Sequence, residues 1–266
     1  MDAKVPKKVS ERLARTVGTY QRILKDALNR DVNESDTVTI VKDMLADVFG
    51  FDKYTEVTSE FAIRGTYCDL AVTLQDTIQY LIEVKAIGLT LKENHLRQAV
   101  GYGATQGIPW VVLTNGVQWE IYAIKFEKPI GQELVFHIDL LELSPRKKDH
   151  QALLFLLCKE GIGKDAIKEF HERSQTVNRF VLAALVQSEP VLALLRRELK
   201  RLAPDARADL DEIKLLLGDV LKRDVLEGEA ATKARRQVQR AAQKPLRQRG
   251  KEKGGDSGTE ATPNPK

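Results

Sequence analysis

The sequence has few of the residues that build disulfide frameworks, zinc sites or membrane spans. Among its 266 residues are two Cys, four His and two Trp. Cys68 and Cys158 stand apart, no Cys/His spacing suits zinc, and the longest apolar run, 152–158, is far too short to cross a bilayer. The first residues also lack the apolar core of a signal peptide. We therefore expect a cytoplasmic protein with two reduced, packed thiols and no membrane association.

A phosphate-binding loop is also missing. The nearest approach, Gly161-Ile-Gly-Lys164, lacks the six-residue frame and the Ser or Thr that would follow the lysine. We therefore expect no ATP site and no ATP-driven motor. The remaining composition, 42% hydrophobic and 30% charged, is that of an ordinary folded chain with room for one core and an appendage.

Excess charge of one sign is confined to the C-terminal end. Residues 228–266 hold ten Lys or Arg against four Asp or Glu, a net charge of +6 within a whole-chain net charge of +4. Residues 1–227 are therefore slightly acidic. Apolar residues are scarce in the tail, which predicts a largely disordered segment that is dispensable for folding and contacts nucleic-acid phosphates.

The most informative stretch is 69–85, whose period-2 alternation predicts two β-strands joined near Asp76. With a three-residue turn centred on Asp76, Asp69 faces Glu83 across the strands. Lys85 lies two residues beyond Glu83 and therefore on the same side. A two-residue turn would break this arrangement, because a one-residue slip moves a side chain to the other face.

These charges form either a surface ion-pair group or a functional site. The strands are apolar almost throughout, which indicates a sheet covered on both faces, where a charge costs free energy unless it is paired or bound to a metal. The carboxylates of Asp69 and Glu83 would form the oxygen site that Mg²⁺ accepts, with Mn²⁺ as a second candidate ion. Lys85 would stabilise the charge that develops on a phosphate under attack.

Two helices are predicted before the first strand. The first covers residues 8–29, and the second begins after the N-cap Asn33 and ends near Gly50. Glu34 continues the apolar stripe of this second helix, so it should face the surface on which the helix packs. Alternatively, a glutamate in the first turn complements the helix dipole, and both roles can coexist.

A third helix is predicted after the hairpin, opened by a capping box of Thr90 and Glu93. Gln98 and Tyr102 lie one turn apart beside its buried face. Taken alone, Gln98 would be an ordinary polar residue on a helix edge. His95, on the same edge, is expected to be a solvated or accessory residue and not a metal ligand.

The predicted element order is two helices, three strands, one helix and three strands. This order is typical of an α/β fold with a mixed sheet flanked by helices. From Pro145 onward the segments are helical in pattern and none has catalytic spacing. We therefore expect three parts, an α/β domain over 1–144, a small all-α domain over 145–227 and the basic tail over 228–266.

The ordered series Asp69, Glu83-Val-Lys85 and Gln98–Tyr102 resembles the D…E-x-K…Q-x-x-x-Y pattern of the PD-(D/E)XK nuclease superfamily. Cys68 stands where the superfamily's name has proline. More narrowly, residues from about 30 to 125 resemble the N-terminal nuclease domain of type I restriction enzyme R subunits. The segments that carry this narrower resemblance are Asn33–Thr37, Phe49–Phe51, Asp69–Ala71, Ile82–Lys85, Gln98–Tyr102 and Leu113–Gly116.

The resemblance implies a restriction-endonuclease-like fold and a Mg²⁺-dependent endonuclease that hydrolyses DNA phosphodiester bonds in restriction, phage defence or DNA processing. Double-stranded DNA is a better candidate substrate than single-stranded DNA, and the partner proteins would belong to a defence or repair system. The residue roles it implies are metal ligands at Asp69, Glu83, the Val84 carbonyl and Glu34, a catalytic lysine at Lys85, and phosphate-positioning residues at Gln98 and Tyr102.

Two other functions remain open from the sequence. The first is a catalytically silent DNA-binding or complex-assembly module on a nuclease fold, but such a module is expected to have lost Glu83 or Lys85, and this chain keeps both. The second is a structural α/β protein, which leaves the clustered carboxylates unexplained.

Overall fold

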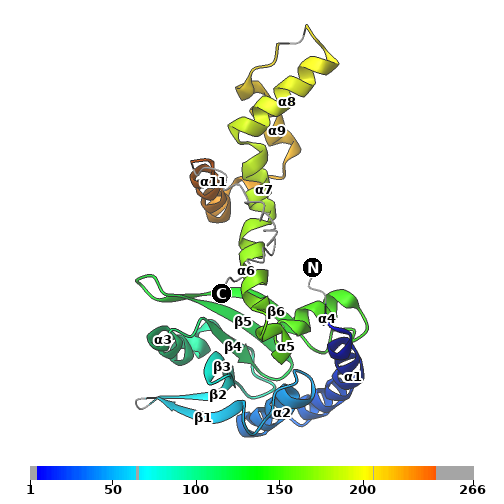
Figure 1. Ribbon diagram of the computed structural model, residues 1–266, viewed down its shortest axis with the longest axis vertical. Helices are drawn as coiled ribbons and strands as arrows, with labels where there is room; N and C mark the ends of the chain where they lie inside the picture. Colours follow the sequence, from blue (N-terminus) through cyan, green and yellow to red (C-terminus); the bar gives the residue numbers. More distant parts are fainter. Residues whose placement is uncertain (1–4, 64–65, 206, 244–266) are drawn as a thin grey trace, which may run out of the picture. The chain divides into compact units, whose positions relative to one another are not determined.

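Six strands form one mixed sheet whose spatial order follows the chain. The computed structural model describes residues 5–63, 66–205 and 207–243 (Figure 1). Strands β3 and β4 run parallel, whereas the other neighbours are antiparallel. The strands are β1 (Val57–Ile63), β2 (Thr66–Leu74), β3 (Thr77–Val84), β4 (Trp110–Thr114), β5 (Gln118–Lys125) and β6 (Gly131–Asp139).

Helices precede, interrupt and follow the sheet in the order that the sequence predicts, so the predicted α/β class is confirmed. The helices are α1 (Lys7–Asn29), α2 (Glu34–Asp47), the 3₁₀ turn η1 (Glu93–Leu96), α3 (Arg97–Gln106), α4 (Lys148–Phe155), α5 (Lys159–Ile162), α6 (Ala166–Thr176), α7 (Arg179–Val186), α8 (Glu189–Leu202), α9 (Leu210–Val220), α10 (Arg223–Leu226) and α11 (Gly228–Ala242).

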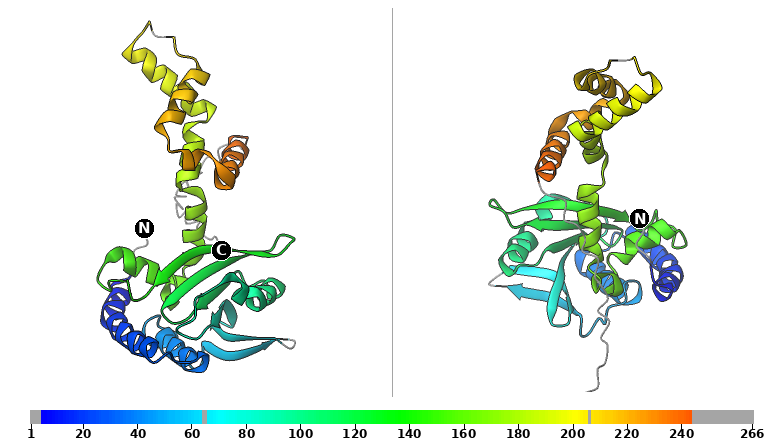
Figure 2. Two further views of the ribbon diagram at one scale, coloured as in Figure 1. Left: turned by 180° about the vertical axis from the view of Figure 1, so that it is seen from behind. Right: turned by 45° about the horizontal axis from the view of Figure 1, so that its top comes forward.

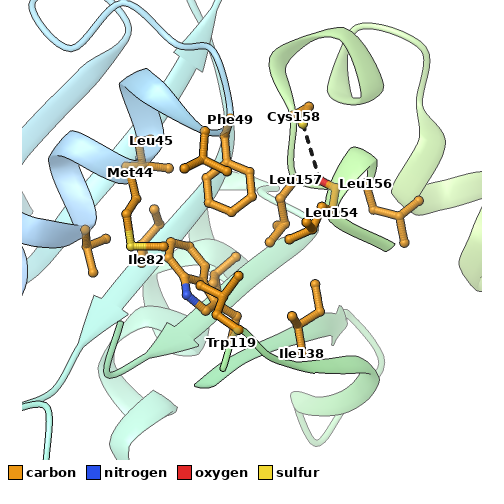
Figure 3. Packing of buried hydrophobic residues seen from close by; sticks show 14 of the residues in the cluster. Met44, Leu45, Phe49, Ile82, Trp119, Ile138, Leu154, Leu156, Leu157 and Cys158 are labelled. Atoms are coloured by element: carbon orange, nitrogen blue, oxygen red, sulfur yellow. Dashed lines mark hydrogen bonds between the residues drawn. The ribbon is translucent and has the colours of Figure 1, made fainter. Parts of the chain in front are cut away.

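Helices cover both faces of the sheet (Figures 1 and 2). On one face, α1, α2 and α4 pack around Ile82 and Trp119. The ring of Phe49, just beyond α2, lies 5.1 Å from that of Trp119 (Figure 3). On the other face, α3 packs through Ala99 against Leu81. Burial on both sides explains why the central strands are nearly continuous apolar runs.

The hairpin between β2 and β3 has a two-residue turn, Gln75-Asp76, so the predicted turn of odd length is wrong. Both residues have positive φ, 50° and 59°, as a type I′ turn requires. The twist of this turn matches that of the strands, which is why it is favoured. On its own, the shorter turn would place Asp69 and Glu83 on opposite faces.

A β-bulge cancels this one-residue slip. The register shifts between Val72 and Thr73, and Gln79 on β3 is left without a partner in the ladder. The register on the far side of the bulge is therefore the predicted one. The turn-side pairs are Thr73–Ile78 and Leu74–Thr77, and the pairs beyond the bulge are Val72–Tyr80, Ala71–Leu81 and Leu70–Ile82.

Helix α2 begins as predicted, because Asn33 Oδ1 accepts a hydrogen bond of 2.9 Å from the Asp36 N–H. The helical segment after the hairpin begins later than predicted. Its first turn is the 3₁₀ turn that starts at Glu93, and the residue preceding it is Lys92, so the predicted capping box at Thr90 is wrong. The Lys92 N–H instead donates to His95 Nδ1 at 3.3 Å.

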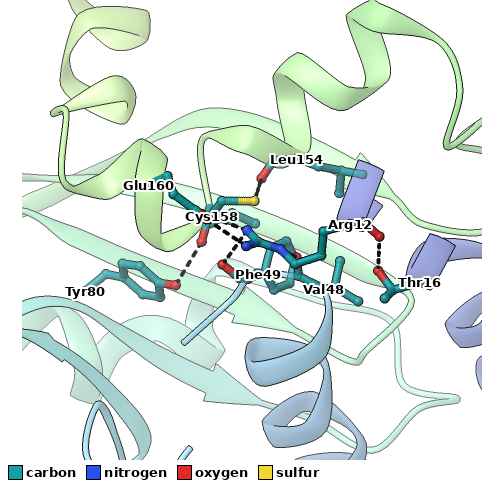
Figure 4. A network of polar contacts seen from close by, with 9 residues as sticks. Arg12, Thr16, Val48, Phe49, Tyr80, Leu154, Cys158 and Glu160 are labelled. Carbon is teal, nitrogen blue, oxygen red and sulfur yellow. Dashed lines mark hydrogen bonds and ion pairs between the residues drawn. The ribbon is translucent and has the colours of Figure 1, made fainter. Parts of the chain in front are cut away.

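Arg12 of α1 joins three segments of the domain (Figure 4). Its guanidinium donates to both carboxylate oxygens of Glu160 at 2.7 Å and to the carbonyls of Val48 at 3.0 Å and Phe49 at 3.3 Å. Gly50 has φ +85°, and a Cβ there would lie 2.6 Å from the guanidinium. The bidentate contact of Arg12 with Glu160, together with its bonds to the two carbonyls, therefore fixes α1 and α5 to the end of α2.

The chain divides into two compact units, residues 1–173 and 174–266. Leu154, Phe155 and Ile167 are buried in the core of the sheet unit. The boundary expected after residue 144 therefore lies after residue 173 in the structure, because the first helices beyond the sheet cover one of its faces.

In the second unit, residues 228–242 are helical and not part of a disordered tail. Ala234 and Val238 of α11 pack against Val181 of α7. A truncation after Glu227 would remove this packing, so we expect α11 to contribute to the stability of the second unit. The rest of the predicted tail, 244–266, lies outside the described residues.

Among described helices, none alone is long and apolar enough to cross a membrane, and only the bent pair 166–186 and 189–202 meets that criterion together.

Arg12→Met should destabilise the protein by roughly 2–4 kcal/mol, because it leaves Glu160 and two carbonyls without their donor. Arg30→Met, which removes an exposed pair with Asp26 at 3.1 Å, is the matched control and should change stability little. Urea unfolding followed by circular dichroism measures both. Equal effects of the two substitutions would contradict a stabilising role for Arg12.

Candidate active site

Glu83 and Lys85 lie at the C-terminal end of β3, in the middle of the sheet. Lys85 Nζ is 2.8 Å from Glu83 Oε1 and 3.4 Å from Glu34 Oε2. The side chains of Glu83 and Lys85 are only 11% and 17% exposed. Ion pairs on open surfaces are far more accessible and contribute little, so the surface ion-pair interpretation does not fit this cluster.

Asp69 reaches the same point from β2. The paired residues of β2 and β3 end at Leu70–Ile82. Two residues further along β3, the Val84 amide donates a hydrogen bond to Asp69 Oδ2 at 2.7 Å. The carboxylate thus takes the place of a strand carbonyl, and the backbone of β3 sets its position. The charge of Asp69 also raises the pKa of Glu83, so the two carboxylates lie within electrostatic range of each other.

Glu34 contributes from the first turn of α2. Its side chain is 49% exposed and reaches the cluster through Lys85. Both interpretations of Glu34 therefore apply, since a carboxylate at a helix N-terminus complements the dipole while it faces the sheet. Three carboxylates and one lysine, from α2, β2 and the end of β3, are brought together.

Burial and neighbouring charges shift the pKa values of Asp69, Glu83 and Lys85. Desolvation raises the pKa of Asp69, although the Val84 amide and Lys85 oppose this shift. Desolvation also raises the pKa of Glu83, with further increases from Asp69 and Glu34. Burial alone would lower the pKa of Lys85, but its hydrogen bond to Glu83 and the nearby carboxylates outweigh that effect and raise it. A bound cation would oppose the desolvation and mutual repulsion that raise these carboxyl pKa values.

None of the described residues donates a hydrogen bond to Glu83 Oε2, although this oxygen is buried. An unpaired buried acceptor costs about 1–3 kcal/mol, so native proteins rarely keep one without a reason. Within the described part of the chain, no three Asp, Glu, His or Cys side chains converge tightly enough to enclose a metal by themselves. Oε2 is therefore a buried acceptor that is available to a ligand.

Gln98 and Tyr102 lie on α3, which covers the face that carries Ala71 and Leu81. Gln98 is exposed, whereas Tyr102 is half-buried and packs against this face. Burial raises the pKa of Tyr102, with a further increase from Cys68. Both residues are thus on the helix that borders the acidic cluster, outside the ion-paired group at the end of β3.

Two residues near the site have positions that the sequence pattern did not indicate. Cys68 is buried among the residues under α3, although strict alternation with Asp69 predicts the opposite face. Burial raises its pKa to about 12, so the thiol is a packed, free group. Asn115, between β4 and β5, donates to the Leu89 carbonyl at 3.0 Å and fixes the segment after Lys85.

Comparison with known families supplies one finding. Residues 44–135 match the family model described as Type I restriction enzyme R protein N terminus. This segment is similar to the N-terminal regions of R proteins. No curated protein and no solved structure matches the chain.

The R-protein match covers about a third of the chain and includes most of the candidate site. Asp69, Glu83, Lys85, Gln98 and Tyr102 fall within it, whereas Glu34 precedes it. The match relates the sheet unit to a subunit of restriction enzymes and is consistent with a nuclease or restriction-related function.

Glu83→Gln should reduce the pH dependence of stability in the absence of divalent metal. A carboxyl whose pKa is raised by folding keeps its proton in the native state after the unfolded chain has lost it. Stability therefore falls as pH rises from the unfolded pKa, about 4.3, toward the folded pKa. Urea unfolding between pH 4 and pH 7 in EDTA should give a flatter profile for the variant. A profile as steep as that of the wild type would contradict the raised pKa.

Proposed function

We propose that the protein is a Mg²⁺-dependent nuclease that hydrolyses DNA phosphodiester bonds. The observation that carries this proposal is the meeting of Asp69, Glu83, Lys85 and Glu34 at the end of β3, with a buried Glu83 oxygen left open. Buried acceptors in native proteins are nearly always paired, so this oxygen calls for a partner such as an ion or water. The match of residues 44–135 to a restriction-enzyme subunit supports the same reading and suggests a role in restriction or phage defence.

The side chains present fit a hard divalent ion. Asp69, Glu83 and the Val84 carbonyl would hold it, with Glu34 contributing directly or through water. Mg²⁺ commonly takes only one or two carboxylates and completes its shell with water and substrate oxygens, so two close carboxylates suffice, and Mn²⁺ accepts the same ligands. When bound, the ion neutralises phosphate charge and lowers the pKa of water.

The protein's own groups would then position and stabilise the reacting phosphate. Lys85, held by Glu83 and Glu34, presents a cation whose position is fixed before the substrate arrives. Such a preorganised charge can orient the attacking water or stabilise the extra negative charge of the transition state. Gln98 and Tyr102 on α3 would hold a neighbouring backbone phosphate, which orients the scissile bond.

A nuclease assay on linear, nicked, single-stranded and circular DNA tests the proposal. The wild type should cleave duplex DNA, circular molecules included, with Mg²⁺ or Mn²⁺ and not with EDTA. Asp69→Asn, Glu83→Gln and Lys85→Met should each lower the rate at least ~10²-fold, because the first two weaken binding of the ion and the third removes the cation that stabilises the transition state. DNA binding without cleavage by the wild type under every metal condition would favour the catalytically silent alternative.

The matched control is the pair Lys125–Glu133 on β5 and β6, whose charged atoms are 2.9 Å apart. Lys125→Met and Glu133→Gln make the same chemical changes on the same sheet, away from β3. They should leave cleavage unchanged. An equal loss of activity in these variants would mean that the effect comes from general damage to the sheet.

Mg²⁺ or Mn²⁺ should raise the melting temperature of the wild type, because the ion binds only the folded site. The free energy of unfolding rises by about 2.7 kcal/mol when the concentration of free ion is 100 times its Kd. Asp69→Ala and Glu83→Ala should lose the shift, as calorimetry can measure. The same metal-dependent rise in all three proteins would contradict the assignment of these two ligands.

The basic C-terminal end should strengthen DNA binding without being needed for the chemistry. Residues 244–266 hold six Lys or Arg against three Asp or Glu. Truncation after Gln243 keeps α11 and should make the plot of log affinity against log salt shallower, by about 0.9 for each phosphate that the segment neutralises in the full chain. Cleavage at saturating DNA should persist. An unchanged slope in salt titrations would show that the segment does not bind DNA.

A further inference from the structure

The second unit exposes an unusual amount of apolar surface. The described residues include sixteen exposed large hydrophobic side chains, and nine of them lie in residues 174–266. Single exposed leucines are ordinary, but a contiguous set marks an interaction surface. Six of the nine lie on two consecutive helices, α8 and α9, namely Leu194, Leu199, Leu202, Leu215, Leu216 and Val220.

These two helices cannot cover their own apolar stripes. They pack side by side (Figures 1 and 2), yet the residues fully buried along them are Leu192 on α8 and Ile213 on α9. On α9, Leu216 lies beside Ile213 and is 58% exposed. On α8, Leu199 lies two turns beyond Leu192 and is 40% exposed. Each stripe thus extends past the contact between the helices, as in a helix that packs against a further partner.

The two helices carry opposite charge. Helix α8 has four basic and two acidic residues, whereas α9 has three acidic residues and one basic residue. A groove along α8 brings its basic side chains together beside an exposed leucine. The groove is lined in part by Arg196, Arg197, Leu199, Lys200 and Arg207. The acidic residues of α9 are Asp211, Glu212 and Asp219.

We propose that the α8–α9 hairpin pairs with the same hairpin of a second copy of this chain, with α8 of each copy against α9 of the other. In a two-fold interface the same surface meets itself, so the surface must be self-complementary. A hairpin with a basic helix, an acidic helix and leucines on both meets this condition. Leu199 and Leu216 would be buried between the copies, and the basic groove of α8 would receive the acidic side of α9.

Other occupants fit less well. DNA would attract α8, but the phosphates would be repelled by α9 and would leave the leucines exposed to water. An anionic membrane surface meets the same repulsion from α9. Residues 244–266 contain a single Leu and no other large hydrophobic residue, so this segment lacks the side chains to cover the stripe.

Sedimentation equilibrium of the full chain tests the pairing. The wild type should reach twice the 29.9 kDa of one chain. Leu199→Asp together with Leu216→Asp should raise the dimer Kd at least ~30-fold, as expected for central interface residues. Ile130→Asp, at a 52% exposed site of the sheet unit, is the matched control and should remain dimeric. Circular dichroism should show unchanged helix content in all three proteins.

Charge reversal separates this pairing from nonspecific association of leucines. Arg196→Glu with Lys200→Glu gives both helices a net negative charge, and Glu212→Lys with Asp219→Lys gives both a net positive charge. Each variant alone should be monomeric, and a 1:1 mixture should form the heterodimer, because each α8 then meets an α9 of opposite net charge.

Three outcomes would overturn the proposal. A wild type that stays monomeric at ~100 μM has no specific pairing of useful affinity. Dimers that survive both the leucine substitutions and the charge reversals use another surface. If the wild type is monomeric and floats with anionic lipid vesicles, and the leucine variant does not float with them, the surface binds a membrane instead.

Discussion

The register of β2 against β3 is the constraint on which the candidate site depends. Asp69 and Glu83 share a face only because the bulge at Gln79 compensates for the two-residue turn at Gln75-Asp76. Beyond Leu70–Ile82 the strands part, and the Val84 amide holds the Asp69 carboxylate in place of a strand carbonyl. Without that register, the charges of the site would be divided between the two layers of helices.

The same geometry places the site under electrostatic strain. Carboxylates are crowded at the end of a strand covered on both faces, so desolvation raises the pKa of Asp69 and Glu83, and one Glu83 oxygen has no partner. Functional sites commonly keep such costs because a ligand removes them, while the rest of the domain supplies the stability. The bidentate contact of Arg12 with Glu160 and the double-sided core serve that purpose here.

The two units differ in how completely they bury their apolar residues. The sheet unit has two extensive clusters, one under each layer of helices. In the described part of the second unit, the cluster of buried residues is small, with Val181, Ala234 and Val238, and leucines of α8 and α9 remain exposed. Association with another copy would supply the burial that this unit lacks, since apolar surface gains about 25 cal/mol for each Å² removed from water.

The sequence by itself determined the class of fold and most members of the candidate site. Period-2 and helical patterns, with Asn33 as a cap, reflect local preferences, so the element order and the proximity of Asp69, Glu83, Lys85 and Glu34 could be predicted. Only the tertiary structure decided the turn length, the bulge and the face on which Cys68 is buried, because compensating shifts in a strand leave no local signal. It also decided that residues up to 173 belong with the sheet and that residues 228–242 form a helix. Both follow from packing against distant residues, which no local pattern encodes.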